Sequence, residues 1–176
     1  MHTLQWVVVE ADDVEDSVNV ADALLENAMG DGDNPSSWYD WYVVGGGRWN
    51  IAEDEDWKAG YDTKTNMVIS FADNPNGFRA KIDELIANRM SAYNEYREEF
   101  AKIDLNAVLD KYQGNMSFSM DTYALRNMLR LIDGDWFYDT KFMDLVHWST
   151  NASHILSKLD KNEGDNLFLV PIDFHF

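Results

Sequence analysis

Hydrophobic and polar positions follow two different periods along this chain, and each period predicts one kind of element. Short apolar runs rich in β-branched or aromatic residues predict strands at residues 3–11, 38–44 and 66–72. RWNIA, which follows three glycines, predicts a further short strand. The final run, LFLVPIDFHF, also predicts a strand, in which Pro171 indicates an edge position or a bulge.

Apolar residues three or four positions apart predict helices between these strands. The predicted helices are residues 14–29, 78–101, 105–112, a segment that begins at Ser119 or Asp121, and NASHILSKLDK. WFYDTKFMDLVHW, residues 136–148, fits either a strand or a helix. The chain is therefore predicted to contain both helices and strands, and neither type dominates.

The order of these elements indicates the fold class. A strand is followed by a helix, then by two or three strands, several helices and a last strand. This order fits a single α+β domain, specifically a ferredoxin-like sandwich with an antiparallel sheet. The helices at about 103–160 would then form an insertion before the last strand. A chain of 176 residues has the usual length of one domain.

Composition excludes several kinds of site and location. The chain has no cysteine, so disulfides, thiolate nucleophiles and cysteine-based metal sites are excluded. MHTLQWVVVEADD lacks the basic start of a signal peptide. Apolar runs are far shorter than the ~20 residues that a membrane span requires, so no membrane partner is expected.

Negative charge is the most extreme feature of the composition. The net charge is −18, and residues 1–62 carry 15 acidic and two basic side chains, a net charge of −13. Such a field repels nucleic acids and attracts basic protein surfaces, although solubility alone also explains it. The acidic surface is expected at Asp12, Asp13, Glu15, Asp16, Glu53, Asp54, Glu55 and Asp56.

The stretch WYDWYVVGGGRWN combines large aromatic residues with three glycines and an arginine. Glycines permit positive φ and expose backbone N–H groups that can bind an anion. Aromatic faces can stack on a ligand, while Arg48 can bind a phosphate. The alternative is structural, with half of the aromatics in the core and Arg48 paired with Asp40. The candidate ligand residues are Trp38, Asp40, Trp41, Tyr42, Gly45, Gly46, Gly47, Arg48 and Trp49.

Two further candidates lie in the last strand. Asp173 and His175 are two positions apart and therefore share one face of that strand. If the first and last strands are neighbours, this face can approach the glycine turn and Asp40. Such a cluster could bind a ligand or perform acid–base chemistry. It is too poor in ligands for a metal, so no metal site is expected.

NPSSWYDWYVVGGGRW, residues 34–49, resembles a signature found in proteins of bacteriophages and some bacteria. Its pattern is Asn-Pro, then Asp-Trp-Tyr, two residues and Gly-Gly-Arg-Trp, often with a final strand that ends in Val-Asp-x-His. This chain has one additional glycine, Gly47, and ends in PIDFHF. The family has no assigned activity. The resemblance therefore implies a phage or prophage protein in the bacterial cytoplasm, without implying a chemistry.

Three functions remain open. The charge favours a non-enzymatic, anti-defence type of protein that binds and inhibits or modulates a host protein with a basic surface. One alternative is a binding protein for a nucleotide-like or phosphate ligand at the aromatic–glycine–Arg48 segment. Another is a hydrolase or transferase that uses Asp40, Asp173 and His175. No cofactor and no direct nucleic-acid contact is expected in any of them.

Overall fold

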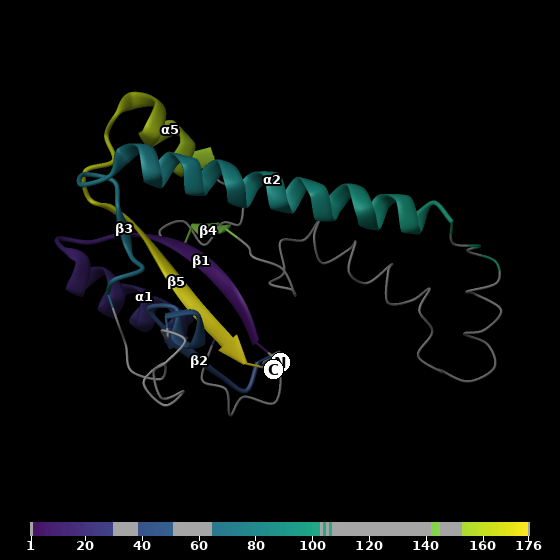
Figure 1. Ribbon diagram of the computed structural model, residues 1–176, viewed down its shortest axis with the longest axis horizontal. Coiled ribbons are helices and arrows are strands. Elements are labelled where there is room, and N and C mark those ends of the chain that lie inside the picture. The colour runs from purple at the N-terminus through teal and green to yellow at the C-terminus, as the bar shows by residue number, and fades with distance from the viewer. Residues whose placement is uncertain are drawn as a thin grey trace.

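A mainly antiparallel sheet with helices on both faces forms the fold, which is therefore of the α+β class (Figure 1). The computed structural model describes residues 2–29, 39–50, 65–102, 104, 106, 142–144 and 153–175. The strands are β1 (His2–Glu10), β2 (Trp41–Val44), β3 (Ile69–Ser70), β4 (Phe142–Asp144) and β5 (Leu167–His175). The helices are α1 (Val14–Met29), the short 3₁₀ helix η1 (Gly47–Asn50), α2 (Pro75–Phe100) and α5 (Ser153–Lys161).

The first and last strands form the centre of the sheet. β1 and β5 pair antiparallel along their full length, from His2 opposite His175 to Glu10 opposite Leu167. β4 pairs parallel with β1 on one side, and β2 and β3 pair with the two ends of β5 on the other. The described order is β2-β5-β1-β4, so both chain ends lie together at one end of the sheet (Figure 1).

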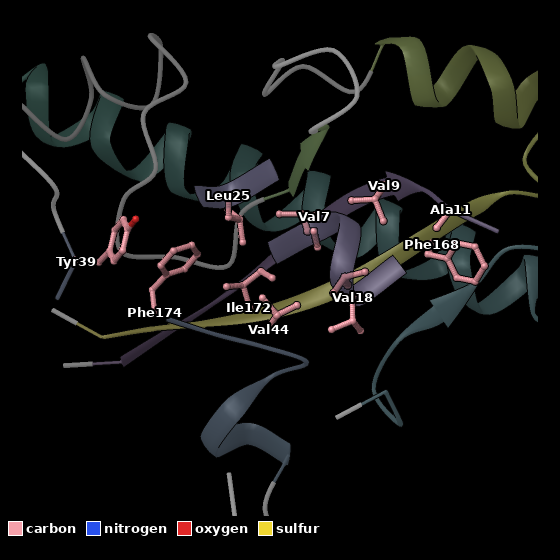
Figure 2. Close-up of a cluster of buried hydrophobic side chains, with 12 residues drawn as sticks. Val7, Val9, Ala11, Val18, Leu25, Tyr39, Val44, Phe168, Ile172 and Phe174 are labelled. Carbon is pink, nitrogen blue, oxygen red and sulfur yellow. The ribbon is translucent and has the colours of Figure 1, made fainter. Parts of the chain in front are cut away.

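One face of the sheet packs against α1. Val7 and Val9 of β1 point to this face because alternate strand residues share a side. They meet Val18 and Leu25 of α1, which recur at helical spacing (Figure 2). The buried members of this core are Val7, Val9, Ala11, Val18, Ala21, Leu25, Tyr39, Val44, Phe168, Val170, Ile172 and Phe174.

The opposite face packs against α2 and α5. α2 begins at Pro75, after Asn74 accepts a hydrogen bond from the Gly77 backbone N–H at 2.9 Å. Its apolar side contacts Trp6 and Val8 of β1. The buried members of this second core are Trp6, Val8, Phe71, Phe78, Ile82, Leu85, Ile155, Leu159, Leu167 and Leu169.

The structure confirms the long predicted elements. Predicted strand 3–11 and helix 14–29 correspond to β1 and α1, and predicted helix 78–101 corresponds to α2. NASHILSKLDK contains α5, and LFLVPIDFHF contains β5. The ambiguous segment 136–148 contains β4, a strand inside the region predicted as a helical insertion. The predicted helices at 105–112 and after Ser119 fall almost entirely outside the described residues.

Two sequence predictions are wrong in detail. The segment that begins RWN is not a strand where it is described, because residues 47–50 form η1. The Trp49 N–H bonds to the Gly46 carbonyl at 3.0 Å, which coils the chain after the glycines. β5 is also an inner strand, although Pro171 predicted an edge or a bulge.

The position of Pro171 explains how an inner strand accommodates a proline. β2 pairs with β5 from Ile172 onward, while β3 pairs only at Phe168 and Leu169. Pro171 lies between them, and its carbonyl accepts from the Gly45 N–H at 2.8 Å. The N–H and C=O of one strand residue point to the same side. The missing proline N–H therefore falls in the gap between β2 and β3, where no ladder bond is lost.

The ferredoxin-like arrangement is not confirmed. The last strand of that arrangement lies at an edge of the sheet, whereas β5 lies between β1 and β2. Within the described part of the chain, no helix is sufficiently long and apolar to cross a membrane.

Candidate functional site

Three strands bring histidine, tryptophan and aspartate side chains together at one end of the sheet. His2 of β1 lies opposite His175 of β5, and His175 lies opposite Trp41 of β2. Side chains directly opposite one another on neighbouring strands are in contact distance. η1 adds Arg48 and Trp49 beside them. We refer to His2, Asp40, Trp41, Arg48, Trp49, Asp173 and His175 together as the histidine corner.

The buried centre of the histidine corner is the carboxylate of Asp173, which is only 1% exposed. Its Oδ1 lies 2.9 Å from His2 Nδ1, and its Oδ2 accepts the Arg48 backbone N–H at 3.0 Å. A carboxylate is buried at an acceptable free energy only when hydrogen bonds or charges replace its water. These two partners satisfy that requirement, and they link β1, β5 and η1.

The three glycines form the turn that delivers the Arg48 N–H to this carboxylate. Gly45, Gly46 and Gly47 have φ values of 96°, 96° and 48°, a backbone region that glycine enters without steric penalty. A Cβ on Gly47 would lie 2.4 Å from Asp173 Oδ2. The sequence left open whether backbone N–H groups near these glycines bind an anion or the segment is structural. In the structure, the anion at this turn is the chain's own Asp173.

A second histidine–carboxylate pair lies beside the first. His175 Nδ1 lies 3.0 Å from Asp40 Oδ2, and Asp40 is largely exposed. The His175 ring stacks on Trp41 with a centroid distance of 4.9 Å and an interplanar angle of 6°. The predicted approach of Asp40 to His175 is thus present. Asp40 pairs with His175 instead of Arg48.

The two imidazole rings contact each other directly. The His2 and His175 centroids are 4.8 Å apart in an edge-to-face arrangement. His2 also makes edge-to-face contacts with Trp41 at 5.3 Å and with Trp49 at 6.0 Å. The imidazoles are therefore held in place by carboxylates on one side and by indoles on the other.

The exposed side of the histidine corner is formed by Trp49 and Arg48. Trp49 is 41% exposed, and the Arg48 guanidinium carbon lies 5.8 Å from its ring centroid. An indole that presents its face beside a guanidinium provides both a stacking surface and a cation. Asn50 supports this segment, because its side-chain amide donates to the Gly45 carbonyl at 2.8 Å.

Tyr42, which the sequence suggested as a ligand residue, lies away from the histidine corner. It packs against the core beneath α1, on the opposite face of β2 from Trp41. Burial raises the pKa of the Tyr42 hydroxyl well above its usual range, and the carboxylate of Asp22 raises it further. Tyr42 therefore remains a neutral structural group that connects β2 to α1.

The predicted acidic surface is described only in part. Asp12, Asp13 and Glu15 are exposed near the start of α1. Asp16 is half-buried, and its carboxylate accepts the Asp12 N–H while its own N–H donates to Asp13. Trp38 and the run Glu53, Asp54, Glu55 and Asp56 lie outside the described residues.

His2 is the corner residue that the sequence analysis missed. An isolated histidine next to the start of a strand carries no motif. The suggestion that the first and last strands are neighbours brings His2 near this end of the sheet, but only the observed register places it opposite His175. Among residues 2–29, 39–50, 65–102, 142–144 and 153–175, no group of three or more His, Asp or Glu side chains is placed to hold a metal ion.

Comparison with known proteins gives no relative from which a function could be transferred. No family model matches the chain, and neither a curated protein nor a solved structure matches it significantly. The functional argument therefore rests on the chemistry of the histidine corner itself.

Proposed function

We propose that the protein binds a small ligand with a phosphate group and a planar ring, such as a nucleotide, at the histidine corner. The observation that carries this proposal is the exposed pair of Trp49 and Arg48, with Trp49 in contact with the His2 ring. An exposed indole stacks on a nucleobase, and a guanidinium forms charge-assisted hydrogen bonds with phosphate oxygens. The buried Asp173 holds this arrangement from below.

Arg48 places an exposed cation at the histidine corner, although the chain has a net charge of −18. Arg48 contributes one positive charge, and Asp40 and Asp173 contribute two negative charges. The phosphate is therefore assigned to the Arg48 guanidinium, which is exposed at the histidine corner.

We expect Arg48→Ala to weaken the binding of adenosine monophosphate at least about tenfold, because a charge-assisted hydrogen bond is lost. Arg48 is exposed and its structural contact with Asp173 uses the backbone, so the variant should melt like the wild type. Isothermal titration with adenosine monophosphate and with adenosine measures the phosphate contribution. Arg97→Ala, an exposed arginine of α2, is the matched control.

A result in which wild type and Arg48→Ala bind adenosine monophosphate equally would contradict this role for Arg48. If the wild-type protein bound neither adenosine monophosphate nor inorganic phosphate, the proposed function itself would be contradicted.

A second candidate function is favoured by the exposed acidic side of α1. Glu15, Asp22 and Glu26 are exposed at positions that share one side of the helix, and Asp12 and Asp13 precede it. A carboxylate stripe of this kind fits a basic protein surface. This is the role of an acidic phage-type inhibitor of a host protein in the bacterial cytoplasm.

The acidic stripe is tested by its salt dependence. A partner captured from bacterial lysate by the wild-type protein should be released at high salt, because screening removes the attraction. The triple variant Glu15→Gln, Asp22→Asn and Glu26→Gln should capture at least about tenfold less of it. Equal capture by both proteins, or capture that salt does not reverse, would eliminate this candidate.

A further inference from the structure

We propose that His2 and His175 act as a general base and a general acid that hydrolyse a phosphodiester bond. This inference rests on the proposed ligand site and adds a reaction to it. The geometry that carries it is a pair of imidazoles in contact, each held at Nδ1 by its own carboxylate.

The carboxylates determine which ring nitrogen can react. Asp173 lies 2.9 Å from Nδ1 of His2, and Asp40 lies 3.0 Å from Nδ1 of His175. A carboxylate accepts the Nδ1 proton, and the neutral ring then carries its lone pair on Nε2. In this proposal, Nε2 is therefore the atom of each ring that transfers a proton. Asp40 and Asp173 act as positioning residues.

The surroundings of the two rings differ and assign the two roles. The partner of His2 is the buried Asp173, which stabilises the imidazolium that forms when His2 accepts a proton. His175 stacks on Trp41, and an indole face attracts a cation. We therefore assign the base to His2 and the acid to His175. Their side chains remain 16% and 31% exposed, respectively.

The reaction balances without a metal or a cofactor. His2 Nε2 removes a proton from a water molecule, and the water oxygen forms a bond to phosphorus. The bond between phosphorus and the leaving oxygen breaks, and His175 Nε2 donates its proton to that oxygen. The products are a phosphomonoester and an alcohol, and exchange with solvent returns both rings to their starting protonation states.

Arg48 and Trp49 complete the site around this step. The Arg48 guanidinium neutralises charge on the non-bridging phosphate oxygens as it develops. Trp49 stacks on a base or another planar group attached to the phosphate and holds the scissile bond near the imidazoles. The substrate class is therefore a phosphodiester with at least one planar substituent.

The test measures turnover and binding separately on the full-length protein. Turnover is followed as release of nitrophenolate from bis(p-nitrophenyl) phosphate, and as cleavage of the dinucleotide ApA. We expect His2→Gln to lower kcat at least about 100-fold on both probes, and His175→Gln to do so on ApA, whose alkoxide leaving group needs a proton, while p-nitrophenolate leaves without one. On ApA, the double variant should be no slower than either single variant, because the two groups act in one step.

Three further variants separate catalysis from folding. His154→Gln, on α5 at the opposite end of β5, is the matched control and should retain full activity. The melting curve of His175→Gln should stay close to that of the wild type. His2→Gln loses a partner of the buried Asp173, so its kcat is measured well below its own melting temperature, which keeps loss of activity distinct from unfolding. Asp40 is exposed, and so is its replacement in Asp40→Asn. This variant should lower kcat more than it raises KM, and it should shift the pH dependence of kcat. Asp40→Glu should restore part of the rate.

The outcomes distinguish this inference from the proposed function. If the wild type binds adenosine monophosphate and cleaves neither probe, the catalytic inference is wrong and the ligand site stands. If it neither binds nor cleaves, both are wrong. If His2→Gln and His175→Gln retain wild-type kcat, cleavage does not use these rings, and the inference is again overturned.

Discussion

Asp173→Ala should lower the free energy of unfolding by about 2–4 kcal/mol, the range for removal of one partner from a buried polar cluster. Asp173 is 1% exposed in the central strand β5 and bonds both His2 and the Arg48 N–H. Alanine would leave this backbone N–H and the imidazole without their acceptor. Unfolding in urea, followed by tryptophan fluorescence, measures the loss.

Two comparison variants make the result specific to the buried carboxylate. Asp165→Ala removes an exposed carboxylate from the loop before β5 and should change stability by less than about 0.5 kcal/mol. Asp173→Asn retains an oxygen acceptor and should lose less than Asp173→Ala. If Asp173→Ala proved as stable as Asp165→Ala, the cluster around Asp173 would contribute nothing to the fold, contrary to the structure.

Gly47→Ala should destabilise the protein by about 3 kcal/mol, because two penalties act together. A Cβ on residue 47 would lie 2.5 Å from the Cβ of Asp173 and 2.4 Å from its Oδ2. The φ of 48° adds strain that an L-residue bears and glycine avoids. The Asp173 Cβ is fixed to the central strand, so the turn must move. Thermal unfolding provides the measurement.

Gly46→Ala is the matched comparison for this prediction. Its φ of 96° is also positive, but its Cβ would meet Met67 Sδ at 2.8 Å. A methionine side chain is flexible and can move away, so Gly46→Ala should cost less than Gly47→Ala. Because the Arg48 N–H follows directly after Gly47, the Gly47 variant should also weaken ligand binding. Equal stability of the two variants would contradict the fixed contact between Gly47 and Asp173.

The local pattern of apolar residues was sufficient to predict the elements that have one side packed against a core. Val14, Val18, Ala21 and Leu25 repeat at helical spacing, and α1 follows that spacing from Val14 to Met29. β1 was similarly evident from its run of β-branched residues. Residues 47–50 were different, because a short polar segment takes its conformation from the preceding turn and from the Asp173 contact.

Much of the histidine corner was also accessible from the sequence. Trp41, Arg48 and Trp49 were chosen from one aromatic–glycine segment, and Asp40, Asp173 and His175 as a cluster that could converge. His2 was inaccessible, because its role depends on the antiparallel register that places it opposite His175. The separation of Tyr42 from Trp41 likewise required knowing which face of β2 meets α1.

The α+β class, the net charge of −18, the absence of cysteine chemistry and the segment in which a turn must occur could all be predicted from the chain alone. These properties follow from composition and from short-range periodicity. The three-dimensional arrangement was needed to establish that β5 lies inside the sheet, that the glycine turn encloses Asp173, and that His2 meets His175. Each of these depends on pairing between residues more than 100 positions apart, which no local pattern encodes.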